Sequence, residues 1–182
     1  MPSSIYTQHP TPPGDTYQMA DKLNIGIIGA GNRGVNGLGA LITAHAEARV
    51  TALSDPNPER MKAAVGSLSP GMKCYTQVDE MLRSEKLDGL VITSPDYLHA
   101  GHVVAALEAG ITHILVEKPI ATTAEGCTQI LESLRTRPAH ISIGFNLRHA
   151  PLARKIKEVI DAGIIGNLMI MENREFYDGG RT

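Results

Sequence analysis

The sequence lacks tryptophan, contains only two cysteines and has no apolar run of the roughly 20 residues that a membrane-spanning helix requires. Its formal net charge is only −2, which indicates neither a nucleic-acid-binding surface nor a basic membrane-binding patch. Cys74 and Cys127 have no metal-binding or redox spacing, so the sequence predicts no disulfide framework. We expect both to be ordinary buried thiols of a reducing compartment. Because no signal-peptide pattern is present either, the expected location is cytoplasmic.

The composition that remains is typical of a globular α/β protein, with 42% hydrophobic and 20% charged residues. The first 22 residues differ from the rest, because they are rich in proline and polar residues and show no periodic apolar pattern. We therefore predict a flexible tail over residues 1–22. It contains no arginine, which argues against a mitochondrial presequence.

From Leu23 onward, short strand-like runs alternate with helical patterns, which is typical of βαβ units and a parallel sheet. The predicted strands are residues 25–28, 50–53, 73–75, 89–93, 114–116 and 141–145. The predicted helices are residues 33–46, 58–65, 78–83, 96–109 and 122–136. This order predicts a doubly wound parallel Rossmann sheet over residues 23–146.

A glycine-rich turn follows the first predicted strand, in the order Gly29-x-Gly31-x-x-Gly34. Gly29 allows a tight turn, Gly31 lets backbone N–H groups approach a pyrophosphate, and Gly34 lets the next helix pack close to the strand. Asp55 follows 21 positions after Gly34 and can accept hydrogen bonds from a ribose diol. Strand, turn, helix and acid together predict a dinucleotide site.

Further polar residues follow other predicted strands at the same edge of the sheet. Ser94-Pro95-Asp96 follows the fourth strand and Glu117-Lys118-Pro119 follows the fifth. Because cofactors bind at the carboxyl ends of parallel strands where strand order reverses, these loops should converge on one crevice. The residues that we expect to bind the cofactor are Gly29, Gly31, Asn32, Arg33, Gly34, Asp55, Ser94, Pro95, Asp96, His99, Glu117, Lys118 and Asn146.

His99 and His102 lie three positions apart on one predicted helix, but no third metal ligand is suggested by the spacing, so no metal site is expected. Asp96 can also act as a helix cap, which would by itself explain an acid at that position. His45, His113 and His140 fall near helix ends or strands, where packing or surface roles are expected.

These motifs resemble those of the glucose-fructose oxidoreductase and inositol dehydrogenase family, Gfo/Idh/MocA. The most specific is Val116-Glu117-Lys118-Pro119, which resembles the Glu-Lys-Pro signature of the family. The other matching segments are residues 26–31, 54–60, 93–99, 144–148 and 163–166, and the resemblance covers roughly residues 23–182.

The resemblance implies an NAD(P)-dependent oxidoreductase that transfers a hydride between nicotinamide and a polyol, sugar or related hydroxy or keto compound. It also implies that Lys118 is catalytic, contacting the nicotinamide ribose and a substrate hydroxyl, and Pro119 is expected to follow a cis bond. Asp55 favours a 2′-hydroxyl over a 2′-phosphate, so NAD is expected rather than NADP. The alternative is that Arg60 or Arg33 turns toward a 2′-phosphate.

Residues 147–182 resemble only the beginning of the second domain of the family. A helix is predicted near residues 152–162 and a strand over residues 168–176, whose free edge could pair with a second copy or another partner. In the family, a larger sheet supplies substrate specificity and an acid/base histidine, which this sequence does not contain. Two interpretations therefore remain open: the amino-terminal part of an oxidoreductase, or a short non-catalytic NAD-binding sensor or partner-binding protein.

Overall fold

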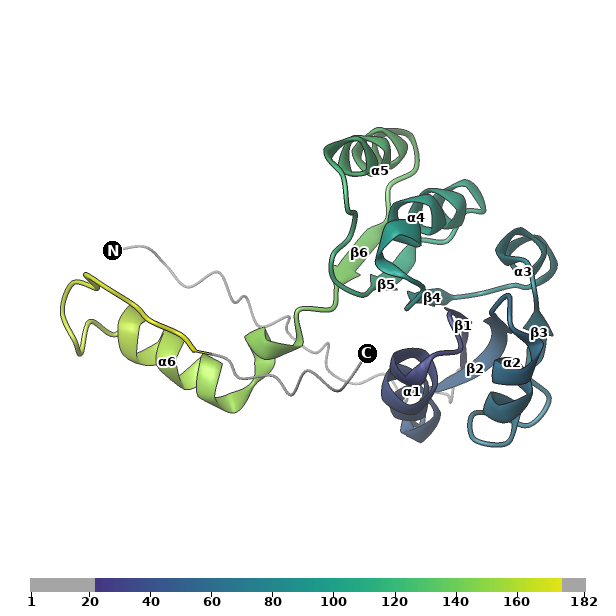
Figure 1. Ribbon diagram of the computed structural model, residues 1–182, viewed down its shortest axis with the longest axis horizontal. Coiled ribbons are helices and arrows are strands. Elements are labelled where there is room, and N and C mark those ends of the chain that lie inside the picture. The colour runs from purple at the N-terminus through teal and green to yellow at the C-terminus, as the bar shows by residue number, and fades with distance from the viewer. Residues whose placement is uncertain (1–21, 175–182) are drawn as a thin grey trace, which may run out of the picture. The chain divides into compact units, whose positions relative to one another are not determined.

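The structure is a computed structural model that describes residues 22–174 of the chain, and the predicted tail lies outside this range apart from Lys22. The chain divides between Ile143 and Gly144 into two units, which are described separately. Figure 1 shows the helices and strands of both units.

The first unit is built on six parallel strands, as predicted. They are β1 (Leu23–Ile28), β2 (Ala48–Ser54), β3 (Lys73–Tyr75), β4 (Gly89–Ile92), β5 (His113–Val116) and β6 (His140–Ile143). Their order in the sheet is β3-β2-β1-β4-β5-β6, so the direction of winding reverses between β1 and β4. Ile28 pairs with Ile92, and Ile92 pairs with Val116, which aligns the carboxyl ends of the central strands. This arrangement is the predicted doubly wound Rossmann sheet.

The helices between the strands also follow the prediction. They are η1 (Arg33–Gly39), which continues into α1 (Ala40–Ala44), then α2 (Pro58–Val65), α3 (Val78–Ser84), η2 (Asp96–Leu98), α4 (His99–Glu108) and α5 (Ala124–Thr136). Side-chain caps fix two starts: Asn57 accepts hydrogen bonds from the Glu59 and Arg60 N–H groups, and Thr123 accepts one from Gly126. The helix predicted over 96–109 opens with the 3₁₀ turn η2.

Two apolar clusters lie on opposite faces of the sheet, because successive strand residues point to opposite sides. Ile28 and Ile92 belong to the cluster that includes residues of α3, α4 and α5. Ile27 and Val91 belong to the other, together with residues of η1, α1 and α2. Helices therefore cover both faces, as buried parallel strands require.

The second face stays partly open as a groove of about 470 Å³ whose lining includes residues of β4, β5 and β6. His45, His113 and His140 are among the residues that line it, and the last two rings stack with centroids 5.3 Å apart. Within residues 22–174, no group of three or more His, Cys, Asp or Glu side chains is arranged to hold a metal ion.

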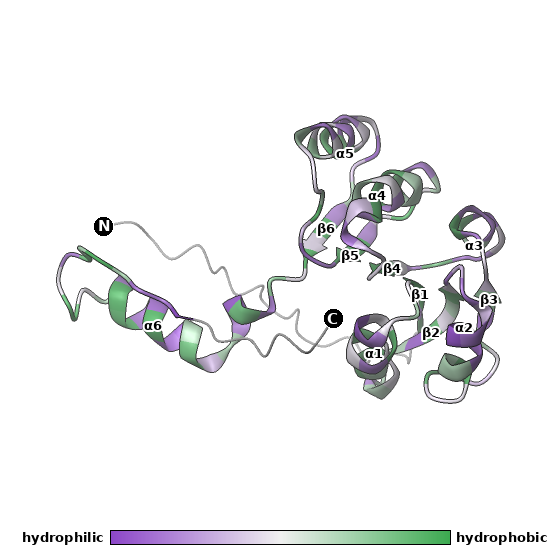
Figure 2. Cartoon of the chain, viewed as in Figure 1, coloured by the Kyte–Doolittle hydropathy of each residue, from purple (hydrophilic) through white to green (hydrophobic). Residues whose placement is uncertain are grey.

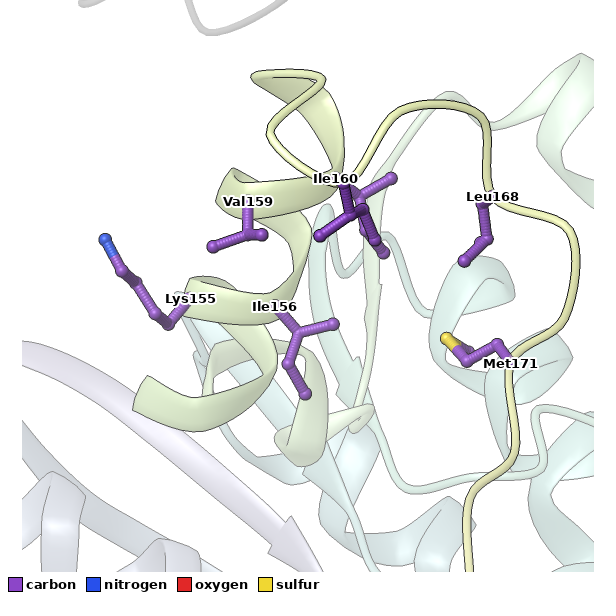
Figure 3. A pocket seen from close by; sticks show the side chains of 7 residues that line it. Lys155, Ile156, Val159, Ile160, Leu168 and Met171 are labelled. Carbon is purple, nitrogen blue, oxygen red and sulfur yellow. The ribbon is translucent and has the colours of Figure 1, made fainter.

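The second unit contains η3 (Asn146–His149) and α6 (Pro151–Asp161). Helix α6 is strongly amphipathic, with the green apolar and purple polar residues visible in Figure 2, yet none of its residues is buried. Its Ile156 and Ile160 line a groove of about 310 Å³. Leu168 and Met171 extend toward α6 from the following segment in Figure 3.

Two predictions are wrong. The described part of the strand predicted over residues 168–176, Leu168–Arg174, forms no strand, because alternation alone does not make one without a partner to complete the ladder. Residues 175 and 176 lie outside the described range. Cys74 and Cys127 are exposed rather than buried. Across the described residues, no helix has the length and apolar character needed to cross a membrane.

Candidate functional site

The glycine turn joins the end of β1 to η1 in a conformation that requires glycine at two positions. Gly29 has a φ of +103°, and an added Cβ would lie 2.7 Å from the carbonyl oxygen of Thr93. At Gly34, an added Cβ would lie 2.1 Å from the carbonyl oxygen of Gly29. Both glycines are therefore needed to bring the turn against the end of β4.

Gly31 has the opposite environment, because an added Cβ would meet no atom within 4 Å. The protein itself does not require glycine here. Open space beside a turn that leads into a helix amino terminus is what a pyrophosphate needs to approach backbone N–H groups. The side chain of the next residue, Asn32, is exposed and accepts a hydrogen bond from Asn36 Nδ2 at 2.9 Å.

Asp55 follows β2 and is held against the glycine turn. Its Oδ2 accepts a hydrogen bond from the Ala30 N–H at 2.8 Å, and its Oδ1 accepts one from the Asn57 N–H at 2.8 Å. The residue is only 5% exposed, so the carboxylate has a fixed orientation. A carboxylate has about four acceptor positions, and two backbone bonds leave capacity for a ribose diol.

The loop after β4 supports the turn from the other side. Thr93 Oγ1 donates to backbone oxygens of β1 and the turn, and its distances to the Ile28 and Gly29 oxygens are 3.0 and 3.1 Å. Ser94 Oγ lies 2.9 Å from His102 Nδ1. Pro95 and Asp96 are exposed, and Asp96 begins η2. Thr93 was not predicted as a site residue, although it begins the segment 93–99 that resembles the family.

The loop after β5 is tied to the glycine turn by an ion pair. Arg33 Nε donates to Glu117 Oε1, across 84 positions of sequence. The Glu117 side chain is 12% exposed, and its Oε2 also accepts a hydrogen bond from the Lys118 N–H at 3.3 Å. This pairing brings two predicted site residues together, although nothing in their spacing indicates it.

Lys118 lies at the exposed end of this loop, and the bond between Lys118 and Pro119 is cis, as predicted. Within residues 22–174, the Lys118 ammonium makes no hydrogen bond or ion pair that would hold it to the protein. It is therefore available to a ligand.

His99 is placed differently from the other predicted residues, because its side chain is 0% exposed. Both ring nitrogens of His99 contact backbone carbonyls, so the ring has no open side from which to contact a cofactor.

The environment of His102 changes its pKa. Burial lowers the pKa of His102, the positive charge of His99 lowers it further, and Asp79 acts in the opposite direction.

A pocket of about 250 Å³ adjoins the glycine turn on the side of α2. Gly31, Asn32 and Arg60 line it together with residues of η1 and α2. Arg60 thus lines the pocket beside the turn, whereas Arg33, which lies within the turn, is paired with Glu117. Asn146 lies in the second unit, at the start of η3.

The first unit therefore presents three kinds of group at the strand ends. The turn offers backbone N–H groups to an anion, Asp55 offers acceptors to a diol, and Lys118 offers an ammonium that has no partner within residues 22–174. An extended ligand with a pyrophosphate and a ribose suits this combination.

Comparison with known proteins agrees with this geometry. Residues 23–145 match the family described as "Oxidoreductase family, NAD-binding Rossmann fold". An inositol 2-dehydrogenase of Corynebacterium glutamicum is 28% identical over 154 residues, which is 84% of this chain and 45% of that protein.

Solved structures show the same relationship. A myo-inositol dehydrogenase from Lactobacillus casei, in complex with NAD(H) and myo-inositol, has a TM-score of 0.72 and 32% identity, over 80% of this chain and 43% of that chain. The myo-inositol 2-dehydrogenase from Lactobacillus plantarum has a TM-score of 0.75 at 23% identity, over 82% of this chain and 44% of that chain, which shows a shared fold. The chain thus spans less than half the length of these relatives.

Proposed function

The chain belongs to the oxidoreductase family with the NAD-binding Rossmann fold, and we propose that it binds NAD as the cofactor part of a dehydrogenase. The observation that carries the proposal is the glycine turn, in which Gly31 faces open space while the Asp55 carboxylate accepts a hydrogen bond from the adjacent Ala30 N–H. An anion cradle and a diol acceptor are thereby fixed next to each other.

The residues present fit the pyrophosphate and the adenosine ribose of NAD. Backbone N–H groups around Gly31 and the start of η1 would hold the pyrophosphate, and Asp55 would accept from the adenosine ribose. When bound, the nicotinamide ring accepts or gives the hydride. The polypeptide supplies binding, orientation and charge around it.

A preference for NAD over NADP follows from the charges beside the turn. The Asp55 carboxylate would repel a 2′-phosphate, and Arg33 is paired with Glu117 rather than free to compensate. Arg60, which lines the adjoining pocket, is the cation that remains for the NADP alternative. Asp55 outweighs it, because the carboxylate is fixed by two backbone hydrogen bonds whereas Arg60 is an exposed side chain.

We further propose that Lys118 is the catalytic residue of this chain. Its ammonium can donate to the nicotinamide ribose and to a substrate hydroxyl, and it would stabilise negative charge that develops on the reacting oxygen. Hydride transfer at a hydroxyl carbon also requires a group that takes or gives the hydroxyl proton. In the family that this chain resembles, a histidine of the second domain has that role, and residues 147–182 contain no counterpart to it.

The substrate class that we propose is a polyol, a sugar or a related hydroxy or keto compound. Support comes from the relatives, which include inositol dehydrogenases. We also propose that residues 23–146 form the cofactor domain, with Asn146 as a cofactor-binding residue at its end, and that residues 147–182 begin a substrate and oligomerisation domain. A cytoplasmic location and assembly through the second domain complete the proposal.

Titration with NADH and NADPH tests the proposed function. Because the chain has no tryptophan, the fluorescence of the reduced nicotinamide can be followed without tryptophan emission from the protein. We expect NADH to bind at least about tenfold more tightly than NADPH, and D55A to weaken NADH binding about tenfold, or about 1.4 kcal/mol. Asp88 provides a matched control, because its carboxylate accepts from the Asn24 N–H at the opposite end of β1.

D88A should leave both affinities unchanged. The proposal fails if the chain shows no saturable NADH binding. It also fails in its assignment of Asp55 if D55A and D88A bind NADH equally well.

A further inference from the structure

His99, the first residue of α4, is the one fully buried histidine among the described residues. Its ring lies between two backbone carbonyls: Nδ1 is 2.6 Å from the Pro119 oxygen and Nε2 is 2.8 Å from the Ser94 oxygen. A buried polar ring is costly unless it is hydrogen-bonded, so both contacts matter to the fold. They connect the loop after β4 with the loop after β5.

Both partners constrain the state of the ring. A carbonyl oxygen only accepts hydrogen bonds, and a neutral imidazole carries a single N–H. In either neutral tautomer, one ring nitrogen would present a lone pair to a carbonyl oxygen at hydrogen-bond distance. Only the imidazolium donates on both sides, and charge-assisted hydrogen bonds are the short ones.

The two contacts of the His99 ring, called here the His99 bridge, join β4 and β5 beyond the last residues that pair in the sheet. β4 and β5 pair as far as Ile92 and Val116, and the Glu117 N–H then donates to the Ile92 oxygen at 2.9 Å. Past this point, the His99 ring joins the two loops. Lys118 therefore lies between two fixed points, the Glu117 carboxylate held by Arg33 and the Pro119 carbonyl held by His99.

We propose that His99, as a doubly donating imidazolium, is a positioning residue that fixes the peptide carrying Lys118. The inference rests on the proposed function, in which Lys118 contacts the nicotinamide ribose. His99 acts through the Pro119 carbonyl, and it does not touch the cofactor.

Two substitutions separate the two contacts of the ring. The amide nitrogen of asparagine can occupy the place of Nδ1, and that of glutamine the place of Nε2. H99N therefore retains donation to the Pro119 oxygen, whereas H99Q retains donation to the Ser94 oxygen and releases Pro119. H102Q is the matched control, since His102 lies one turn further along α4 and contacts the Ser94 hydroxyl.

The test is a double-mutant cycle on the NADH affinity of the full chain. We expect K118A alone to weaken binding about fivefold, and H99Q alone to weaken it about fivefold. In the K118A background, H99Q should change the affinity less than about twofold, because the positioned group is already absent. H99N and H102Q should stay within about twofold of the wild type.

Equal losses from H99Q with and without K118A would overturn the inference, because His99 would then act only as a part of the core. If K118A has no effect, the assignment of Lys118 in the proposed function fails, and the positioning role fails with it. Histidine ¹⁵N spectra give an independent reading. Both ring nitrogens of His99 should carry a proton, and a single protonated nitrogen would contradict the doubly donating bridge.

Discussion

The two units use their apolar residues differently. In the first unit, Ile28 and Ile92 lie in an apolar cluster between the sheet and the helices α3, α4 and α5. In the second, α6 has an equally clear apolar stripe, yet Leu152 is 73% exposed and Ile156 is 45% exposed. A periodic pattern therefore predicts that a helix forms, whereas burial depends on a second element that completes the layer.

The largest expected effect on the free energy of unfolding comes from truncating one isoleucine in each unit to alanine. Ile92 is 0% exposed, so I92A should lower the free energy of unfolding by about 4 kcal/mol through lost burial and a cavity. I156A should change it by less than about 0.5 kcal/mol, because the side chain is already partly solvated. Urea denaturation followed by circular dichroism measures both. Similar losses would show that α6 is as well packed as the sheet.

The next effect distinguishes two glycines of the same turn. G34A places a methyl group against the Gly29 carbonyl, and we expect a loss of about 3 kcal/mol in stability. G31A has open space, so its stability should stay unchanged while its NADH affinity falls about tenfold or more. Thermal unfolding and NADH titration separate the two. A destabilised G31A with normal NADH affinity would remove the argument that this space belongs to the cofactor.

A smaller effect concerns how the helices begin. Asn57 caps α2 through two backbone N–H groups, so N57A should cost about 1 kcal/mol. Helix α6 begins after Ala150, which makes no side-chain cap, so A150S should increase helix content rather than reduce it. Denaturation curves and far-ultraviolet circular dichroism read the two changes. If N57A is neutral, the cap does not contribute to the stability of the first unit.

The smallest effect is the pH dependence that His102 adds to the first unit. Because burial and His99 lower the pKa of His102, the unfolded chain binds its proton more readily than the folded chain just below pH 6.5. Its contribution to stability is therefore present above pH 6.5 and is lost as the pH falls toward the folded pKa. H102N should flatten the dependence of the melting temperature on pH in this window. H149N, which removes a histidine of the second unit, is the control, and an unchanged slope in H102N would contradict the assignment.

The sequence predicted most of the sheet because local signals were sufficient there. The near-continuous apolar run at 89–93 predicts a strand that is buried on both faces, and residues 89–92 form the buried strand β4. The strand predicted over 168–176 is wrong in its described part because a strand needs a neighbour, which a local pattern does not contain.

The sequence predicted which segments lie at the strand ends, but it did not predict the side-chain contacts between them. The glycine turn, Asp55 and the Glu117-Lys118-Pro119 loop follow from motif and strand order. The Arg33–Glu117 pair and the two carbonyl contacts of His99 do not follow from the sequence. They join loops that are distant in the sequence and that lie together only because their strands pair in the sheet. Such contacts depend on tertiary structure and leave no fixed spacing in the sequence.

Hydrogen–deuterium exchange with and without NADH tests the central claim, which is that the strand ends of the first unit hold the cofactor. We expect NADH to slow exchange in peptides that cover residues 28–36 and 53–60, because backbone N–H groups of the glycine turn would contact the pyrophosphate and Asp55 the ribose. Unchanged exchange in both segments at saturating NADH would contradict the account.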